Sequence, residues 1–208
     1  MTTHPSSPSR VAALILAGGK GMRMGGCDKP LLPLNDRTVL DTVLDTIAPH
    51  CAAIAISANG DAKRYAPWNL PVLPDANTAY GPLAGVLAGL YWARDVGVDT
   101  LVTIPGDTPF VPPTLISALS PPTKVAASNG RRHHLVASWP VSCAEALQDW
   151  LAATHTDSQR RVRFFADTLN VQEVAFSCQP HDPFFNINTP EDYATAQNRA
   201  QETHAHAR

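Results

Sequence analysis

The sequence predicts an α/β protein with a mostly parallel central sheet between layers of helices. Residues 11–17 form a continuous apolar run of strand length, which is typical of a central parallel strand covered on both faces. Strand-like and helix-like segments then alternate along the chain, as βαβ units require. Polar loops follow these strand-like runs, where open α/β sheets bind their ligands.

Length and composition describe one ordinary globular domain. Of the 208 residues, 44% are hydrophobic and 16% are charged, which permits one sizeable core and excludes a disordered chain. We expect a folded domain over residues 11–200, between a disordered tail at 1–10 and a frayed tail at 201–208. Sixteen basic and 18 acidic residues give a formal charge of -2, which argues against partners such as nucleic acid or an anionic membrane.

Cysteine usage and hydropathy indicate a cytoplasmic protein. The four cysteines, at positions 27, 51, 143 and 178, form no CxxC pair, which argues against a zinc site and against a disulfide framework. No apolar stretch approaches the roughly 20 residues of a membrane-spanning helix. We therefore expect reduced thiols and cytoplasmic localisation.

The first half of the chain contains four predicted strands and two predicted helices. Strands are expected at residues 11–17, 52–57, 72–73 and 100–104, and the short third one is bracketed by prolines. Apolar residues at helical spacing predict helices over residues 39–47 and 83–94. Gly85 and Gly89 each cost the second helix about 1 kcal/mol relative to alanine, so we expect close packing to account for them.

The second half continues the alternation. A helix is expected near residues 113–119, and two strands at 124–128 and 135–139 are separated by the polar segment 129–134. Two helices follow at roughly 142–153 and 159–168. A last strand at 171–176 precedes a closing helix with Pro190 in its first turn.

The loop after the first strand is built for a polyanion. Residues 14–29, LILAGGKGMRMGGCDK, carry an apolar run followed by five glycines, one arginine and two lysines. Glycines let backbone N–H groups approach phosphate closely, and Arg23 and Lys29 add positive charge. The spacing misses G-x-G-x-x-G by one position and lacks the Walker A ending. A flexible surface loop with solvated charges is the alternative.

Two aspartates follow other predicted strands. Asp107 comes directly after the strand at 100–104, and a carboxylate fixed at a strand end suits Mg²⁺, which takes one or two protein carboxylates and completes its shell with phosphates and water. A turn or helix cap explains Asp107 equally well. Asp75 is open to the same reading, although a carboxylate can also accept N1–H and N2–H of guanine.

Four motifs together resemble the molybdenum cofactor guanylyltransferase family. They are LAGGKGMRMGGCDK at residues 16–29, DANTAYGPLAG at 75–85, PGDTPF at 105–110 and FNINTPED at 185–192. Their order and spacing agree with the family over nearly the whole folded chain. The resemblance implies a single three-layer Rossmann-like nucleotidyltransferase domain that transfers GMP from GTP to molybdenum-bearing molybdopterin and releases pyrophosphate.

The resemblance also implies roles for individual residues. Lys29, Arg23 and Asp107 are the expected catalytic groups, and Asp107 is the expected Mg²⁺ ligand. Asn186 and Asn188 are expected to bind the pterin, although loop capping is the alternative for both. His133 stands where the family commonly has a histidine. The residues expected to contact GTP are Leu16, Ala17, Gly18, Gly19, Lys29, Asn59, Asp75 and Asp107.

The chain departs from the family pattern at Gly106, where a cysteine is common, and at Pro30, which follows the lysine. The family further implies transient contacts with other proteins of cofactor biosynthesis and with apo-molybdoenzymes. The GGxDK and DTP forms favour guanylyl transfer. A pterin cytidylyltransferase, a sugar-phosphate nucleotidyltransferase and a non-catalytic nucleotide or pterin carrier are the alternatives.

Overall fold

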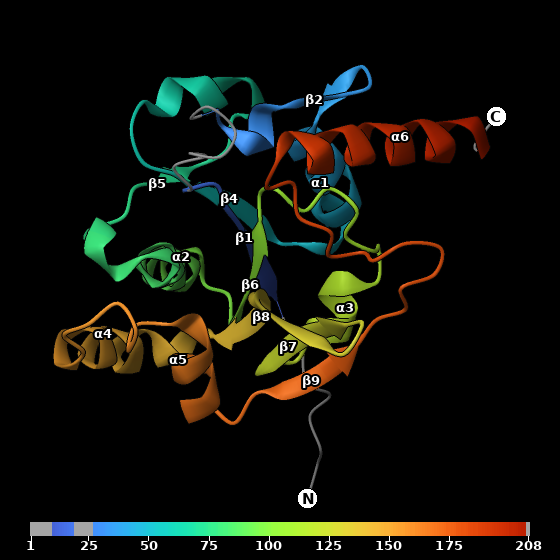
Figure 1. Ribbon diagram of the computed structural model, residues 1–208. Coiled ribbons are helices and arrows are strands. Elements are labelled where there is room, and N and C mark those ends of the chain that lie inside the picture. The colour runs from blue at the N-terminus through green and yellow to red at the C-terminus, as the bar shows by residue number, and fades with distance from the viewer. Residues whose placement is uncertain (1–9, 19–26, 207–208) are drawn as a thin grey trace, which may run out of the picture.

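The computed structural model describes residues 10–18 and 27–206, and these form one seven-stranded sheet between two layers of helices (Figure 1). The strand order is β5-β4-β1-β6-β8-β7-β9, and only β8 is antiparallel to its neighbours. The prediction of a mostly parallel sheet is confirmed. The strands are β1 (Val11–Leu16), β4 (Ala53–Ser57), β5 (Val72–Leu73), β6 (Thr100–Pro105), β7 (Lys124–Ser128), β8 (Arg131–Pro140) and β9 (Gln172–Ala175).

Strand β1 lies in the middle of the parallel part of the sheet. Its even-numbered residues Ala12 and Leu14 pack into one hydrophobic cluster and its odd-numbered residues pack into another, because alternate side chains of a strand point to opposite faces. Leu16 is in register with Ser57 of β4 and with Pro105 of β6. Three strands therefore end at the same level, and their loops leave from one edge.

Helices cover both faces of the sheet, as Figure 1 shows. The first cluster is completed by α2 (Pro82–Val96), α4 (Ala144–Ala153) and α5 (Val162–Thr168), and the second by α1 (Val39–Ile47) and α3 (Leu115–Leu119). The last helix, α6 (Pro190–His206), packs on a small hairpin through Leu34, Ile187 and Ala196. It extends beyond residue 200, where we expected the domain to end.

Two strand predictions need correction. The polar segment 129–134 is not a loop: β8 begins at Arg131, and a two-residue turn joins it to β7. Asn129 and Gly130 both have positive φ, 49° and 70°, which is the backbone of a tight hairpin. A second hairpin, of β2 (Pro33–Leu34) and β3 (Arg37–Thr38), was not predicted.

The two glycines of α2 are explained by close packing, as predicted. A Cβ on Gly89 would lie 2.5 Å from Leu14 Cδ2 and 3.0 Å from Leu101 Cδ2, and a Cβ on Gly85 would overlap the Ser57 hydroxyl. Leu14 and Leu101 are fully buried, so they have little room to move. The glycines allow α2 to pack closely on β1, β4 and β6.

All four cysteines are free, as expected. Burial raises the pKa of the Cys51 and Cys143 thiols to about 12, so both stay protonated and unreactive. Within the part of the chain that the structure describes, no helix combines the length and apolar character needed to cross a membrane.

We expect Gly89→Val to lower the free energy of unfolding by about 2 kcal/mol, because its side chain overpacks the buried contact with β1 and β6. Helix propensity alone would make this substitution stabilising by a few tenths of a kcal/mol, because valine is a better helix former than glycine. The close packing therefore predicts a change of the opposite sign. The control is Ala88→Val on the half-buried side of the same helix, where about 0.5 kcal/mol is expected from propensity. Urea unfolding measures both, and an equal or smaller loss for Gly89→Val would contradict the close packing.

Candidate active site

The loops after β1, β4 and β6 are joined by backbone hydrogen bonds at the carboxyl edge of the sheet. Ala17 N donates to Ser57 O over 2.8 Å, and Gly106 N donates to Leu16 O over 2.9 Å. These bonds hold the first residues of each loop close to the strand ends. The chain therefore leaves β1, β4 and β6 at one edge of the sheet, where the sequence predicts the ligand loops.

Asp107, directly after β6, is the centre of a cluster of four polar side chains. Lys29 Nζ lies 3.0 Å from Asp107 Oδ2, and Asn186 Nδ2 donates to Asp107 Oδ1 over 2.9 Å. Lys29 Nζ also donates to Asn188 Oδ1 over 2.7 Å. The Lys29 and Asp107 side chains are only 18% and 19% exposed, so solvent screens this ion pair less than it screens a surface pair.

The loop before α6 is built to hold Asn186 and Asn188 in this cluster. Ile187 N donates to Asp107 O over 3.0 Å, and Asn186 Nδ2 also reaches Thr108 Oγ1. Thr189 and Asp192 cap α6 reciprocally, and Asp192 Oδ2 additionally accepts from Asn188 N. Because the side chains of Thr189 and Asp192 form the cap, the Asn188 side chain is available to Lys29. Helix capping was the alternative explanation of both asparagines, but Thr189 and Asp192 cap the helix instead.

A second network surrounds the loop after β5. Asn59 Nδ2 donates to Asp75 Oδ2 over 2.7 Å, and Asp75 N donates back to Asn59 Oδ1 over 2.9 Å. Arg64 continues this network, since it donates to Asn59 O over 2.7 Å and its Nε lies 2.8 Å from Asp28 Oδ2. Gly18 adjoins the network, because a Cβ there would lie 3.8 Å from Asn59 Nδ2. The networks of Asp75 and Asp107 are thus linked through neighbouring residues Asp28 and Lys29.

The two departures from the family pattern contact each other. A Cβ on Gly106 would lie 2.7 Å from Pro30 Cγ and 3.3 Å from Leu16 O. The ring of Pro30 therefore occupies the space that a side chain at position 106 would need. The glycine and the proline compensate for one another, and neither displaces Lys29 or Asp107.

One pocket of about 800 Å³ opens over this edge of the sheet. Most of the predicted site residues from both networks line this pocket, and Asn59 supports it through its hydrogen bond to Asp75. Gly19 and Arg23 lie outside the described residues. The predicted residues that line the pocket are Leu16, Ala17, Gly18, Lys29, Asp75, Asp107, His133, Asn186 and Asn188.

The pocket also has lining residues that the sequence did not single out. Ser57 lies beneath Asp75, with Ser57 Oγ 3.5 Å from Asp75 Oδ1. Arg131 and Arg132 at the start of β8, together with Arg161 and Arg163 around the start of α5, form one side of the pocket. The Asn-Gly pair at 129–130 was the sequence signal that could have identified Arg131 and Arg132, because a tight turn there extends β8 toward the pocket.

His133 is positioned by a partly buried relay of hydrogen bonds. Ser128 Oγ donates to Asp182 Oδ1 over 2.7 Å and lies 2.7 Å from His133 Nε2. A hydroxyl has one proton, so His133 Nε2 carries the hydrogen that Ser128 accepts. Phe184 packs against the imidazole in a tilted arrangement, with ring centroids 4.8 Å apart. The relay ties β7 and β8 to the segment that leads to Asn186.

Comparison with known proteins gives consistent results. The family described as MobA-like NTP transferase domain matches residues 13–171. A molybdenum cofactor guanylyltransferase of Acidiphilium cryptum is 47% identical over 92% of this chain and 96% of its own, and one of Mesorhizobium japonicum is 42% identical over the same shares. The solved structure of molybdopterin-guanine dinucleotide biosynthesis protein A from Archaeoglobus fulgidus matches with a TM-score of 0.66. It is 20% identical and covers 92% of this chain and 99% of its own, so it supports the fold alone.

His133 makes the stability of the protein depend on pH. Burial lowers the pKa of its imidazole below the ordinary 6.5, and Arg131 and His134 lower it further, while Asp182 opposes them. As the pH falls below about 6.5, the unfolded chain therefore binds more protons than the folded protein does. The free energy of unfolding decreases as a result. In His133→Gln we expect the free energy of unfolding to fall less steeply than in the wild type between pH 7 and pH 5. His155→Gln, at an exposed position, should leave the wild-type slope, and identical slopes for all three proteins would contradict this account.

Proposed function

The chain belongs to the MobA-like family of molybdenum cofactor guanylyltransferases, and from this premise we propose how its pocket transfers GMP from GTP to molybdenum-bearing molybdopterin. The observation that carries the proposal is the cluster of Lys29, Asp107, Asn186 and Asn188. This cluster lies in the same pocket as the loop after β1 and Asp75. One continuous site is thereby available to two substrates.

GTP is the substrate on the side of β1, β4 and β5. The backbone at Leu16, Ala17 and Gly18 adjoins Asp75, whose carboxylate is oriented by Asn59. A carboxylate held in this way accepts N1–H and N2–H of guanine, a pair that cytosine and uracil lack. Lys29 neutralises phosphate charge. Gly19 and Arg23 belong to the same phosphate loop in this proposal.

The transfer is a displacement at the α-phosphorus of GTP. A terminal phosphate oxygen of molybdopterin forms the new P–O bond, and the bond from the α-phosphorus to the oxygen that bridges it to the β-phosphorus breaks. The electron pair of that bond leaves with pyrophosphate. Because the attacking phosphate is already anionic, the reaction requires no strong general base. It requires positioning of two anions and neutralisation of their charge.

Mg²⁺ fits the chemistry of this pocket. Among the described residues there is no group of three or more His, Cys, Asp or Glu side chains that would hold a metal, but Mg²⁺ accepts a single carboxylate when phosphates and water supply its other ligands. We propose Asp107 as that carboxylate. The ion would neutralise charge on the phosphates. Lys29, which now lies against Asp107 Oδ2, is the cation that already neutralises the carboxylate without metal.

Molybdopterin is the substrate on the side of Asn186 and Asn188. Each amide offers donors and an acceptor of the kind that a pterin edge pairs with. Their present partners, Asp107 and Lys29, lie on the GTP side of the cluster. Contacts with apo-molybdoenzymes and other cofactor-synthesis proteins belong to this proposal as the route of delivery, and the cytoplasm is the compartment it implies.

The experiment supplies GTP labelled at the α-phosphate, Mg²⁺ and molybdenum-bearing molybdopterin to the purified chain. We expect the label in a pterin guanine dinucleotide, with unlabelled pyrophosphate released and little competition from excess CTP. In Asp107→Asn, turnover is expected to fall about 10²- to 10³-fold, because one charge is lost without a change of shape.

The control is Asp95→Asn, which removes an exposed carboxylate from α2 and should keep wild-type turnover. Label transfer from CTP in preference to GTP would make the protein a cytidylyltransferase. Binding of GTP without any pyrophosphate release would indicate a carrier. Asp107→Asn with turnover within threefold of the wild type would remove Asp107 from its proposed role.

A further inference from the structure

The arginine side of the pocket has no role in the function as described so far. It consists of Arg131 and Arg132 on β8 and of Arg161 and Arg163 around the start of α5, and we call it the arginine wall. We propose that Arg131 and Arg163 of this wall form an anion-binding subsite for the acceptor substrate, molybdopterin. The proposal rests on the proposed function, since it names residues that select its second substrate.

The order of strands separates the wall from the nucleotide side. Along the sheet, β5, β4 and β1 lie on one side of β6, and β8 lies on the other. Asp75 follows β5, and Asp107 follows β6 in the middle. β8 is antiparallel to β6, and their pairing ends at Thr103 and Ala137. The first residues of β8, including Arg131, therefore extend past the carboxyl edge of the sheet on the side away from Asp75.

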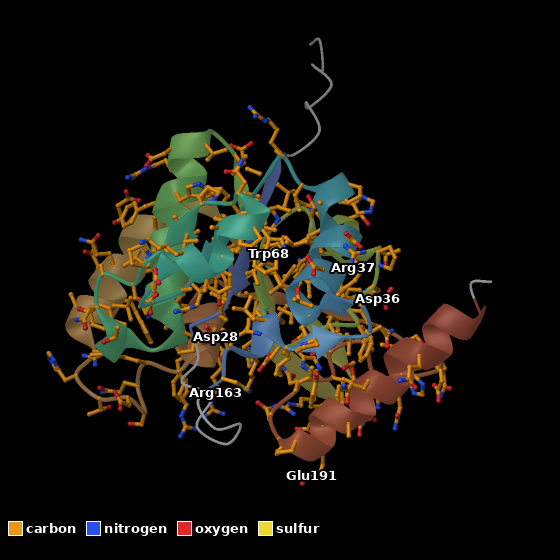
Figure 2. All side chains as sticks on the ribbon, turned by 90° about the horizontal axis from the view of Figure 1, so that it is seen from above. Asp28, Asp36, Arg37, Trp68, Arg163 and Glu191 are labelled. Atoms are coloured by element: carbon orange, nitrogen blue, oxygen red, sulfur yellow. The ribbon has the colours of Figure 1, made fainter. Side chains whose placement is uncertain are left out.

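Packing of α5 adds Arg163 to the same wall. Val162 and Phe165 are buried in the cluster beneath α5, and this anchors the helix. Arg163 is exposed between them. In the view of Figure 2, Arg163 lies toward the same edge as Asp28, and both Arg163 and Lys29, which follows Asp28, line the pocket.

The charge of the wall is local, and the protein neutralises only part of it. The whole chain carries a formal charge of -2, yet the carboxylates that line the pocket are Asp75 and Asp107, and Asp107 is already paired with Lys29. In the wall, Arg132 pairs with Glu173 over 2.8 Å. No described carboxylate lies within ion-pair distance of Arg131, Arg161 or Arg163. Like charges gathered in this way favour binding of an anion.

The wall also acts on the histidines beside it. Burial lowers the pKa of His134; Asp167 opposes this effect, and Arg132 and Arg163 add to it. Arg131 has the same effect on the pKa of His133. Both imidazoles are therefore neutral near pH 7, and the positive charge of this side is carried by guanidinium groups, which do not titrate.

The chemistry of the wall matches a phosphate monoester. Guanidinium groups bind phosphate oxygens through two parallel hydrogen bonds. Two sources of phosphate meet in this pocket, the triphosphate of GTP and the monoester of molybdopterin. The position of Arg131 on the far side of β6 from Asp75 assigns the wall to molybdopterin.

The test measures binding of each substrate separately. Molybdopterin is titrated into the purified full chain and followed by pterin fluorescence, and GTP is titrated by calorimetry. Arg131→Gln and Arg163→Gln are each expected to weaken molybdopterin binding about fivefold, and the double variant about 20-fold, while GTP binding stays within about twofold. Arg163→Lys, which keeps the charge but loses the fork, should be intermediate.

Salt dependence separates an electrostatic role from a structural one. Raising NaCl from about 50 to 300 mM should weaken molybdopterin binding to the wild type several-fold and to the double variant much less. Arg94→Gln is the control, because it removes the same charge from α2, where Arg94 forms an exposed ion pair with Glu145 of α4. It should bind both substrates as the wild type does.

The outcomes distinguish this subsite from the proposed function. Weaker GTP binding in the variants, with molybdopterin binding unchanged, would assign the wall to the triphosphate and overturn the proposal. Unchanged binding of both substrates would also overturn it. If the variants weaken molybdopterin binding but the wild type transfers no GMP, the subsite stands and the proposed transfer fails.

Discussion

The ion pair between Lys29 and Asp107 is the interaction on which the site depends. The pair joins the first residue of a 3₁₀ turn to the loop after β6, and its two residues are 78 positions apart in the sequence. Lys29 Nζ lies 3.0 Å from Asp107 Oδ2. Asn186 and Asn188 then attach the segment before α6 to the two ends of the same pair. Removing one partner would leave a mostly buried charge without compensation, which is far costlier than losing a surface pair.

The sheet explains why this pair lies at the centre of the pocket. β1 and β6 are adjacent and parallel, and the chain crosses to opposite sides of them through α1 and α2. Such a reversal leaves a crevice at the carboxyl ends of the strands. Antiparallel β8 places its first residues at that same edge. The crevice therefore has Gly18 and Asp75 on one side and the arginine wall on the other, with Asp107 between them.

The sequence was sufficient for the parts of the fold that depend on local pattern. The apolar run of β1, the helical spacing of α1, the glycines of α2 and Pro190 at the start of α6 all lie where they were predicted. Asp75, Asp107, Asn186 and Asn188 were predicted as loop residues after strands or before a helix. The structure brings all four to one pocket.

Other features of the site depend on tertiary contacts that no local pattern specifies. Arg131 and Arg132 resemble solvated charges until β8 is extended to the Asn-Gly turn. Gly106 and Pro30 are separate departures in sequence, and only their contact shows that one makes room for the other. The relay from Asp182 through Ser128 to His133 spans three segments, so its members carry no common sequence signal.

The central claim is that Lys29 and Asn188 act as one unit joining the two substrate sides of the pocket. A double-mutant cycle measures it directly, with Lys29→Met, Asn188→Ala and the double variant compared by their affinity for molybdopterin. The account predicts that the two losses are not additive and that the coupling free energy is at least about 1 kcal/mol. Losses that add to within about 0.3 kcal/mol would contradict it, because they would show that the two side chains contribute independently.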